Sequence, residues 1–158
     1  MQSNNLQRLI ELADSVFDTK NDNNQLDVNE DVLLKLQKIH PSTISEYNEG
    51  NGPIAWVLLI PTTEELMFKF IKKDISEKQL FELTPLNAKY EALYLCSALV
   101  LKEYRNKGIT KQLTLSAIEN IRKTHLIKSL FVWPFSTEGN IVAENIANIV
   151  LLPLLKRE

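Results

Sequence analysis

The chain is poor in cysteine, histidine and glycine. Its 158 residues include one Cys, two His and four Gly. A single cysteine, Cys96, excludes an internal disulfide and is typical of a cytoplasmic protein. One Cys and two distant His, His40 and His125, cannot supply a zinc site of the usual ligand number. We therefore predict a cytoplasmic protein without a metal site.

The chain also lacks an excess of charge of one sign and any long apolar run. Its formal net charge is −2, which gives no electrostatic footprint for nucleic acid or an anionic membrane. The longest apolar runs, residues 56–60 and 149–152, are too short to span a bilayer. The first residues lack the basic start and apolar run of a signal peptide. We expect neither nucleic acid nor a membrane as a partner.

Two familiar catalytic motifs are missing, and one binding motif is incomplete. The sequence contains no G-x-S-x-G elbow and no Walker G-x-x-x-x-G-K-[ST] loop. Residues 22–31 are acidic and rich in amides, as in a calcium loop. However, Leu26 and Asp27 stand where such a loop needs an oxygen ligand and a glycine. We interpret this stretch as an exposed linker between two helices.

The first half of the chain predicts helices and strands in turn. Apolar spacing predicts two amphipathic helices, one over residues 6–17 and a second that is capped by Asp27 or Asn29 and ends before Pro41. A hairpin follows, with strands 43–47 and 53–60 around a turn rich in Gly and Asn, and Pro61 is expected to close it. Capping boxes at Thr62 and Ser76 then predict two short helices, a helical insertion over residues 62–83.

The second half alternates between strands and helices. We predict a strand over 91–101, a helix over 108–123, a strand over 128–135, a helix over 137–150 and a short edge strand within 151–156. This order implies a parallel pair of strands joined by a right-handed crossover. The fold class is therefore α/β (α+β), a mixed sheet flanked by helices, in one domain over residues 1–158.

A glycine stands between the buried strand and the helix of this crossover. Gly108 allows a backbone conformation in which successive N–H groups point at one spot just before the helix starts. Those donors and the positive end of the helix dipole suit a pyrophosphate, and Arg105, Lys107 and Lys111 add positive charge. The alternative is an ordinary turn, because a glycine between strand and helix is common in α/β proteins.

The whole segment around this glycine resembles a known signature. Residues 97–110, an apolar strand, a Glu103-Tyr104 link and then Arg105-x-x-Gly108-x-Thr110 at a helix start, closely resemble the coenzyme A motif of the GNAT acetyltransferases. Thr110 stands where that family has Gly or Ala. The resemblance implies that the chain binds acetyl-CoA and has a GNAT-like sheet, centrally splayed between strands 91–101 and 128–135.

The resemblance also implies which residues hold the donor. The backbone of Ala98, Leu99 and Val100 would pair with the pantetheine arm. The loop and helix start would bind the pyrophosphate through the following residues: Arg105, Asn106, Lys107, Gly108, Ile109, Thr110 and Lys111.

The chain departs from the family pattern in three places. The helix over 136–150 contains Asn140, Asn145 and Asn148 but no tyrosine, which many members use there as the general acid. The insertion 62–83 replaces a short connection. The chain stops at Glu158, before the last antiparallel strands, so we expect a sheet that is shortened at its C-terminal side. That edge would be covered by the inserted helices or by a second copy in a homodimer.

Two residues on strand 91–101 are candidates for catalysis. Alternation along a strand places Tyr94, Cys96, Ala98 and Val100 on one face. Tyr94 falls where some histone-modifying relatives place a glutamate base, and it is our candidate acid or proton relay; otherwise it is a buried tyrosine with a satisfied hydroxyl. Cys96 is a candidate acyl-accepting nucleophile; otherwise it is a small core residue.

These observations predict an acyl-CoA-dependent N-acyltransferase that moves acetyl from acetyl-CoA to an amine of a small molecule or a protein. The missing helix tyrosine and the shortened C-terminus favour an alternative, a catalytically inactive coenzyme A-binding or regulatory module of the same fold. A third interpretation is a plain structural domain in which Gly108 only forms a turn.

Overall fold

The structure is a computed structural model that describes residues 11, 30–48, 50, 52–134 and 136–158. Except for Glu11, the predicted first helix lies outside the described residues. The candidate caps Asp27 and Asn29 and almost all of the stretch 22–31 lie outside them too.

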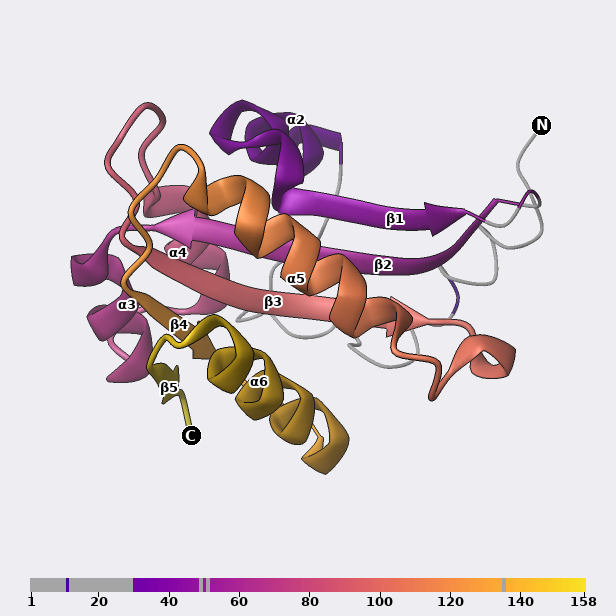
Figure 1. The fold of residues 1–158 in the computed structure, drawn as a ribbon. Coiled ribbons are helices and arrows are strands. Elements are labelled where there is room, and N and C mark those ends of the chain that lie inside the picture. The colour runs from indigo at the N-terminus through magenta and orange to yellow at the C-terminus, as the bar shows by residue number, and fades with distance from the viewer. Residues whose placement is uncertain (1–10, 12–29, 49, 51, 135) are drawn as a thin grey trace.

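A five-stranded mixed sheet forms the centre of the molecule (Figure 1). Its strands are adjacent in chain order: β1 (Ile44–Asn48), β2 (Pro53–Thr62), β3 (Ala92–Val100), β4 (Ser129–Val132) and β5 (Leu154–Lys156). The first three pair antiparallel, whereas β3, β4 and β5 pair in parallel. The predicted α/β class, with its mixed sheet flanked by helices, and the parallel crossover are thus confirmed.

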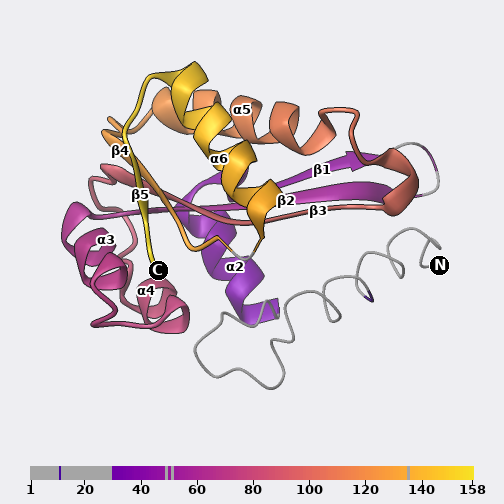
Figure 2. The ribbon, with the colours of Figure 1, turned by 90° about the horizontal axis from the view of Figure 1, so that it is seen from below.

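Helices cover both faces of this sheet (Figure 2). One face carries α5 (Ile109–Arg122) and α6 (Thr137–Val150), and the other carries α2 (Glu30–Ile39), α3 (Glu64–Ile71) and α4 (Glu77–Leu83). The largest fully buried side chains come mainly from the sheet and from the layer of α2, α3 and α4, among them Leu36, Phe70, Tyr94 and Phe131. Apolar burial between the layers is the main stabilising term of this arrangement.

The strand β2 runs two residues further than the sequence predicts, through Pro61 to Thr62. The pairing of β1 with β2 ends at Leu58. On that side of β2, the missing N–H of Pro61 therefore costs the sheet no hydrogen bond. As a result, Thr62 is not the cap of the next helix. Thr63 caps α3 instead, accepting a hydrogen bond from the Leu66 backbone N–H at 3.3 Å.

The second predicted capping box is confirmed at the start of α4. The Ser76 hydroxyl accepts a hydrogen bond from the Gln79 backbone N–H at 3.1 Å, and the Gln79 side chain accepts one from the Ser76 backbone N–H at 2.9 Å. These two bonds satisfy donors that the helix start would otherwise leave unpaired. They fix the position of the next residue, Glu77.

The strand β3 contains a bulge that the sequence does not reveal. Leu59 pairs with Leu95 and the adjacent Leu58 pairs with Ser97, so Cys96 is an extra residue on β3. A bulge shifts the alternation of side chains beyond it by one position. The expected common face of Tyr94, Ala98 and Val100 is therefore wrong. Cross-strand pairing places Ser97 and Leu99 on the face of Tyr94, and places Ala98 and Val100 on the other face.

Candidate active site

Among the described residues, half of β3 has no strand partner on the side of β4. Pairing with β4 covers only Ala92–Leu95, and ends with Leu95 opposite Val132. Beyond this point β3 continues from Cys96 to Val100, paired with β2 on its other side. Ala98 is exposed although it lies in the central strand of the sheet. This edge can hydrogen-bond an extended ligand as an added strand would.

The same strand leads into the loop before α5. Asn106 has a φ of 65° and Gly108, the N-cap of α5, has a φ of 74°, both in the left-handed region. A Cβ at Gly108 would meet nothing within 4 Å, so its dihedral angle, not lack of space, favours glycine here.

The start of α5 is suited to an anion. No side chain caps this helix, and its first turn carries no acidic residue. The first helical bond runs from the Gln112 N–H to the Gly108 carbonyl oxygen, at 3.0 Å. The preceding N–H groups of Ile109, Thr110 and Lys111 are the donors that a helix start leaves without an intrahelical partner, at the positive end of its dipole.

Cations surround this helix start. Arg105 and Lys107 are exposed and Lys111 is half-buried. The Lys107 ammonium lies 5.5 Å from the centre of the Tyr104 ring. Within the described part of the chain, none of the three cations forms an ion pair. The structure thus places the predicted residues 105–111 in one exposed, electropositive loop next to the free edge of β3.

A buried carboxylate brings the two candidate catalytic residues together. The Tyr94 hydroxyl donates a hydrogen bond of 2.6 Å to Oε2 of Glu77, and the Cys96 thiol approaches the same oxygen at 3.8 Å. Tyr94 is fully buried and Glu77 is 5% exposed. The Tyr94 ring stacks on Phe131 at 4.9 Å and meets Phe70 edge to face at 5.0 Å. We call Glu77, Tyr94 and Cys96 the carboxylate cluster.

This environment keeps both hydroxyl and thiol protonated. Burial, followed by the negative charge of Glu77, raises the pKa of Tyr94 well above its ordinary value. The same two causes, in the same order, raise the pKa of the Cys96 thiol well above its ordinary value. A raised pKa lowers the fraction of Cys96 present as the thiolate, the nucleophilic form.

Arg157 forms one wall beside the cluster. Its guanidinium lies between two rings, 4.5 Å from the centre of Phe70 and 4.7 Å from that of Trp133. It donates to the carbonyl oxygen of Ile75 at 2.9 Å, and its positive charge acts on Tyr94 in the direction that lowers the pKa. This contact ties the segment after β5 to the helical insertion.

Sequence reasoning did not find Glu77 or Arg157 as site residues. Glu77 follows a capping serine, where an acidic side chain is favoured by the helix dipole alone. No spacing in the sequence indicates that this carboxylate is buried against β3. Arg157 is separated by 82 residues from the carbonyl group it contacts, so no local pattern could reveal the pair.

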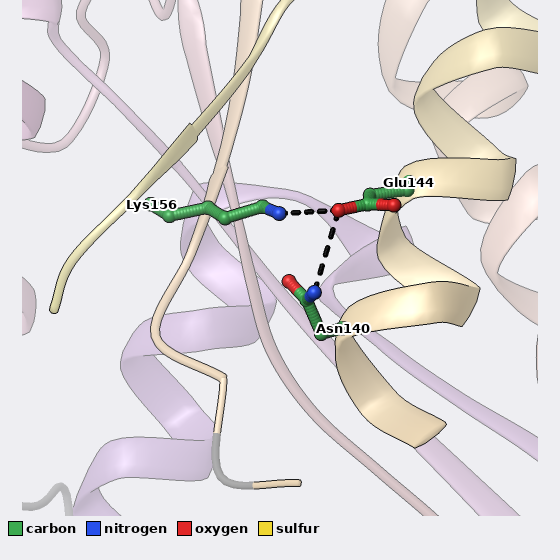
Figure 3. Close-up of polar contacts among 3 residues, drawn as sticks. All are labelled: Asn140, Glu144 and Lys156. Carbon is green, nitrogen blue, oxygen red and sulfur yellow. Dashed lines mark hydrogen bonds and ion pairs between the residues drawn. The ribbon is translucent and has the colours of Figure 1, made fainter. Parts of the chain in front are cut away.

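Asn140 on α6 carries a buried oxygen without a partner (Figure 3). Its Nδ2 group donates to Oε1 of Glu144 at 3.3 Å, and Lys156 of β5 pairs with the same oxygen. Its Oδ1 atom is removed from water, and no donor in the described part of the chain hydrogen-bonds to it. Asn140 precedes the buried Ala143 by three residues, so it lies on the inner face of the helix. An orphaned acceptor of this kind costs about 1–3 kcal/mol unless a ligand satisfies it.

The two histidines lie together, away from the residues above. The His40 and His125 rings are 6.0 Å apart, and His125 lies 4.9 Å from the Tyr90 ring. Burial, followed by the charge of His125, lowers the pKa of His40. No group of three or more His, Cys, Asp or Glu among the described residues could hold a metal ion.

Two further features belong to the part of the chain that the structure describes. None of its helices is long and apolar enough to cross a membrane. A groove of about 370 Å³ lies between α5 and α6. None of the residues that line it is a predicted site residue; the lining consists of Leu115, Ile118, Glu119, Arg122, Ile149 and Val150.

Comparison with known proteins found a weak structural similarity. No protein-family model matches the chain, and no curated protein matches it. A solved structure described as "The crystal structure of acetyltransferase" is similar over 95% of this chain and 86% of its own, with 16% sequence identity and a TM-score of 0.47. A similarity at this level carries no conclusion about function.

Proposed function

We propose that the protein is an acyl-CoA-dependent N-acyltransferase that transfers acetyl from acetyl-CoA to an amine. The observation that carries this proposal is the continuity of two binding elements. The edge of β3 that β4 leaves unpaired leads, through residues 101–108 and their short 3-10 helix (Lys102–Tyr104), to the electropositive start of α5. A long ligand with an amide-containing arm and a pyrophosphate would use both elements at once.

Residues of this chain fit the parts of such a donor. The backbone of Ala98, Leu99 and Val100 would bind the pantetheine amides, and residues 105–111 would bind the pyrophosphate. Asn140 Oδ1, which is buried without a partner, would accept a hydrogen bond from a ligand N–H. The donor supplies an acetyl thioester, whose carbonyl carbon an amine can attack.

The chemistry proposed for the protein is proton transfer. Tyr94 stays protonated at neutral pH and is held by Glu77, so it can act as an acid or relay toward the leaving sulfur. The acceptor would be an amine of a small molecule or of a protein. A homodimer and a cytoplasmic location remain predictions of the sequence.

A second candidate function is a coenzyme A-binding or regulatory module without turnover. Two observations favour it: Tyr94 is fully buried, and α6 contains no tyrosine that could protonate the sulfur. Binding of the donor is common to both candidates, so it is the first property to measure.

Calorimetric titration with acetyl-CoA tests the shared requirement. We expect micromolar binding by the native chain and loss of binding in Gly108→Trp, because a large side chain would fill the space in front of the helix start. Gly50→Trp is the matched control, since Gly50 also has a positive φ and no atom within 4 Å of a built Cβ.

Retained binding in Gly108→Trp would remove the loop from the site. Absence of binding by the native chain would overturn both candidate functions.

A further inference from the structure

We propose that Glu77, on the helical insertion, is the base that accepts the proton of the acceptor amine, with Tyr94 as the relay to the leaving sulfur. This inference rests on the proposed function and deepens it. It assigns the base to a residue outside both the signature segment and the strand on which the sequence predicts the catalytic groups.

The open edge of β3 would bring the thioester close to Glu77. A pantetheine arm paired with Ala98 to Val100 runs along the edge that β4 leaves free, and this edge ends where Leu95 meets Val132. Cys96 is the first residue beyond that point. A thioester at the end of the arm therefore reaches the level of Cys96, whose sulfur is 3.8 Å from Oε2 of Glu77.

An amine would have access to the Glu77 carboxylate from the side of the bulge. Tyr94 and Glu77 are buried, but Cys96 and Ser97 are half-buried and Ala98 is exposed. At the bulge, the carboxylate cluster thus borders the more exposed half of β3. An amine that enters at the bulge would meet the carboxylate before the core.

The proposed proton transfers use only the groups of the carboxylate cluster. The amine nitrogen forms a bond to the thioester carbonyl carbon, and its proton passes to the Glu77 carboxylate. The carbon–sulfur bond then breaks. Tyr94 gives its hydroxyl proton to the sulfur and takes the proton that Glu77 has accepted, along the existing 2.6 Å hydrogen bond. The products are an amide and a free thiol, and both residues return to their starting state.

Three charged or titratable groups described near the carboxylate come from β3 and from the segment after β5. From β3 these are Tyr94 and Cys96, and from the segment after β5 the guanidinium of Arg157 acts on Tyr94. Phe70 of α3 and Phe131 of β4 contribute aromatic rings only. The Tyr94 hydroxyl and the Cys96 thiol both donate to the Glu77 carboxylate, and hydrogen bonds of this kind favour its charged form, the form that accepts a proton.

The test compares Glu77→Gln with Glu82→Gln, a change at an exposed carboxylate on the same helix. Release of coenzyme A thiol from acetyl-CoA is followed with methylamine, lysine and spermidine as amine probes, and acetyl-CoA binding is measured by calorimetry. We expect Glu77→Gln to lose at least about 100-fold in kcat, with the donor Kd within about twofold of native. Glu82→Gln should behave as native.

A second readout does not depend on turnover. Cys96 is the sole cysteine of the chain, so alkylation by iodoacetamide reports on this site alone. Removing the negative charge of Glu77 lowers the Cys96 pKa, so Glu77→Gln should be alkylated faster than native at the same pH. Saturating coenzyme A should protect Cys96 in the native protein.

The possible results distinguish failure of the proposed function from failure of the assignment of Glu77. If the native chain does not bind acetyl-CoA, the proposed function fails. If it binds the donor and Glu77→Gln keeps native turnover, or if native transfers acetyl to none of the probes, the assignment of Glu77 as the base is wrong. Unchanged alkylation in Glu77→Gln, with an unchanged melting temperature, would contradict the contact on which it rests.

Discussion

At the scale of single residues, buried polar atoms mark the site more clearly than residue types do. The Glu77 carboxylate receives two donors from β3, and Asn140 Oδ1 receives none. Protein interiors rarely leave such an acceptor unsatisfied. Burying the Asn140 oxygen and the Glu77 carboxylate each costs free energy of folding. Binding of a ligand to Asn140, or transfer of a proton to Glu77, would offset that cost.

Asn140 allows a direct test of that cost. We expect Asn140→Ala to be at least as stable as the native chain, because the change removes a buried acceptor whose desolvation costs about 1–3 kcal/mol. At the same time it should lose about tenfold in acetyl-CoA affinity, the equivalent of one hydrogen bond. Urea unfolding and calorimetry measure the two effects.

Asn145→Ala is the matched control, since Asn145 is exposed on the same helix. It has the same gain in helix propensity but should leave affinity unchanged. A large loss of stability in Asn140→Ala alone would mean that the buried oxygen has a structural partner.

At the scale of elements, the insertion positions the carboxylate through the start of one short helix. The helix α4 has seven residues, too few to be stable without packing and a good cap. Its box at Ser76 and Gln79 fixes the first turn, and Glu77 is the first residue of that turn. Local chemistry at the cap thus determines where the proposed base lies.

Ser76→Ala should therefore affect stability and site together. We expect a loss of about 1 kcal/mol of unfolding free energy, typical for a removed N-cap. Cys96 alkylation should also become faster, because Glu77 would be held less firmly. Ser116→Ala, at an exposed position within α5, controls for the loss of a hydroxyl, and equal effects of the two changes would argue against the role of the cap.

At the scale of the whole molecule, the fold joins the ends of distant elements. His40 follows α2 and His125 follows α5, yet their rings are 6.0 Å apart, and His125 also contacts Tyr90. Burial and the charge of the partner histidine lower the pKa of His40 in the folded chain. In the unfolded chain, His40 keeps its ordinary pKa of about 6.5. Below that pH the unfolded chain therefore binds more protons than the folded chain does.

Stability should consequently fall as the pH falls below about 6.5, until His40 is protonated in the folded chain as well. Thermal unfolding between pH 7.5 and 5 measures this slope. His125→Gln removes the neighbouring charge, so its slope should be shallower. A slope that is equal in the two proteins would show that burial alone shifts the pKa of His40.

The exposed ion pairs Glu91–Lys128 and Glu144–Lys156 lower the pKa values of their carboxyl groups. Their contribution to stability is therefore lost only at more acidic pH.

Local signals in the sequence were sufficient for most elements of the fold. Apolar runs and turn residues predicted β2 and the hairpin, and α6 has the bounds that its spacing indicated. The box at Ser76 was visible because its two partners are three residues apart. The left-handed Gly108 at the start of α5 was also predictable, since few other residues adopt that conformation.

Only the tertiary structure decided which side chains meet. The bulge at Cys96 depends on how β3 pairs with β2, and it reverses the faces of Ala98 and Val100. The contact of Glu77 with Tyr94 joins two elements that no periodicity relates. Propensity, capping and alternation act over a few residues, so they are written in the sequence itself. Strand register and the burial of a charge are set by the packing of the whole chain, and they appear only once it has folded.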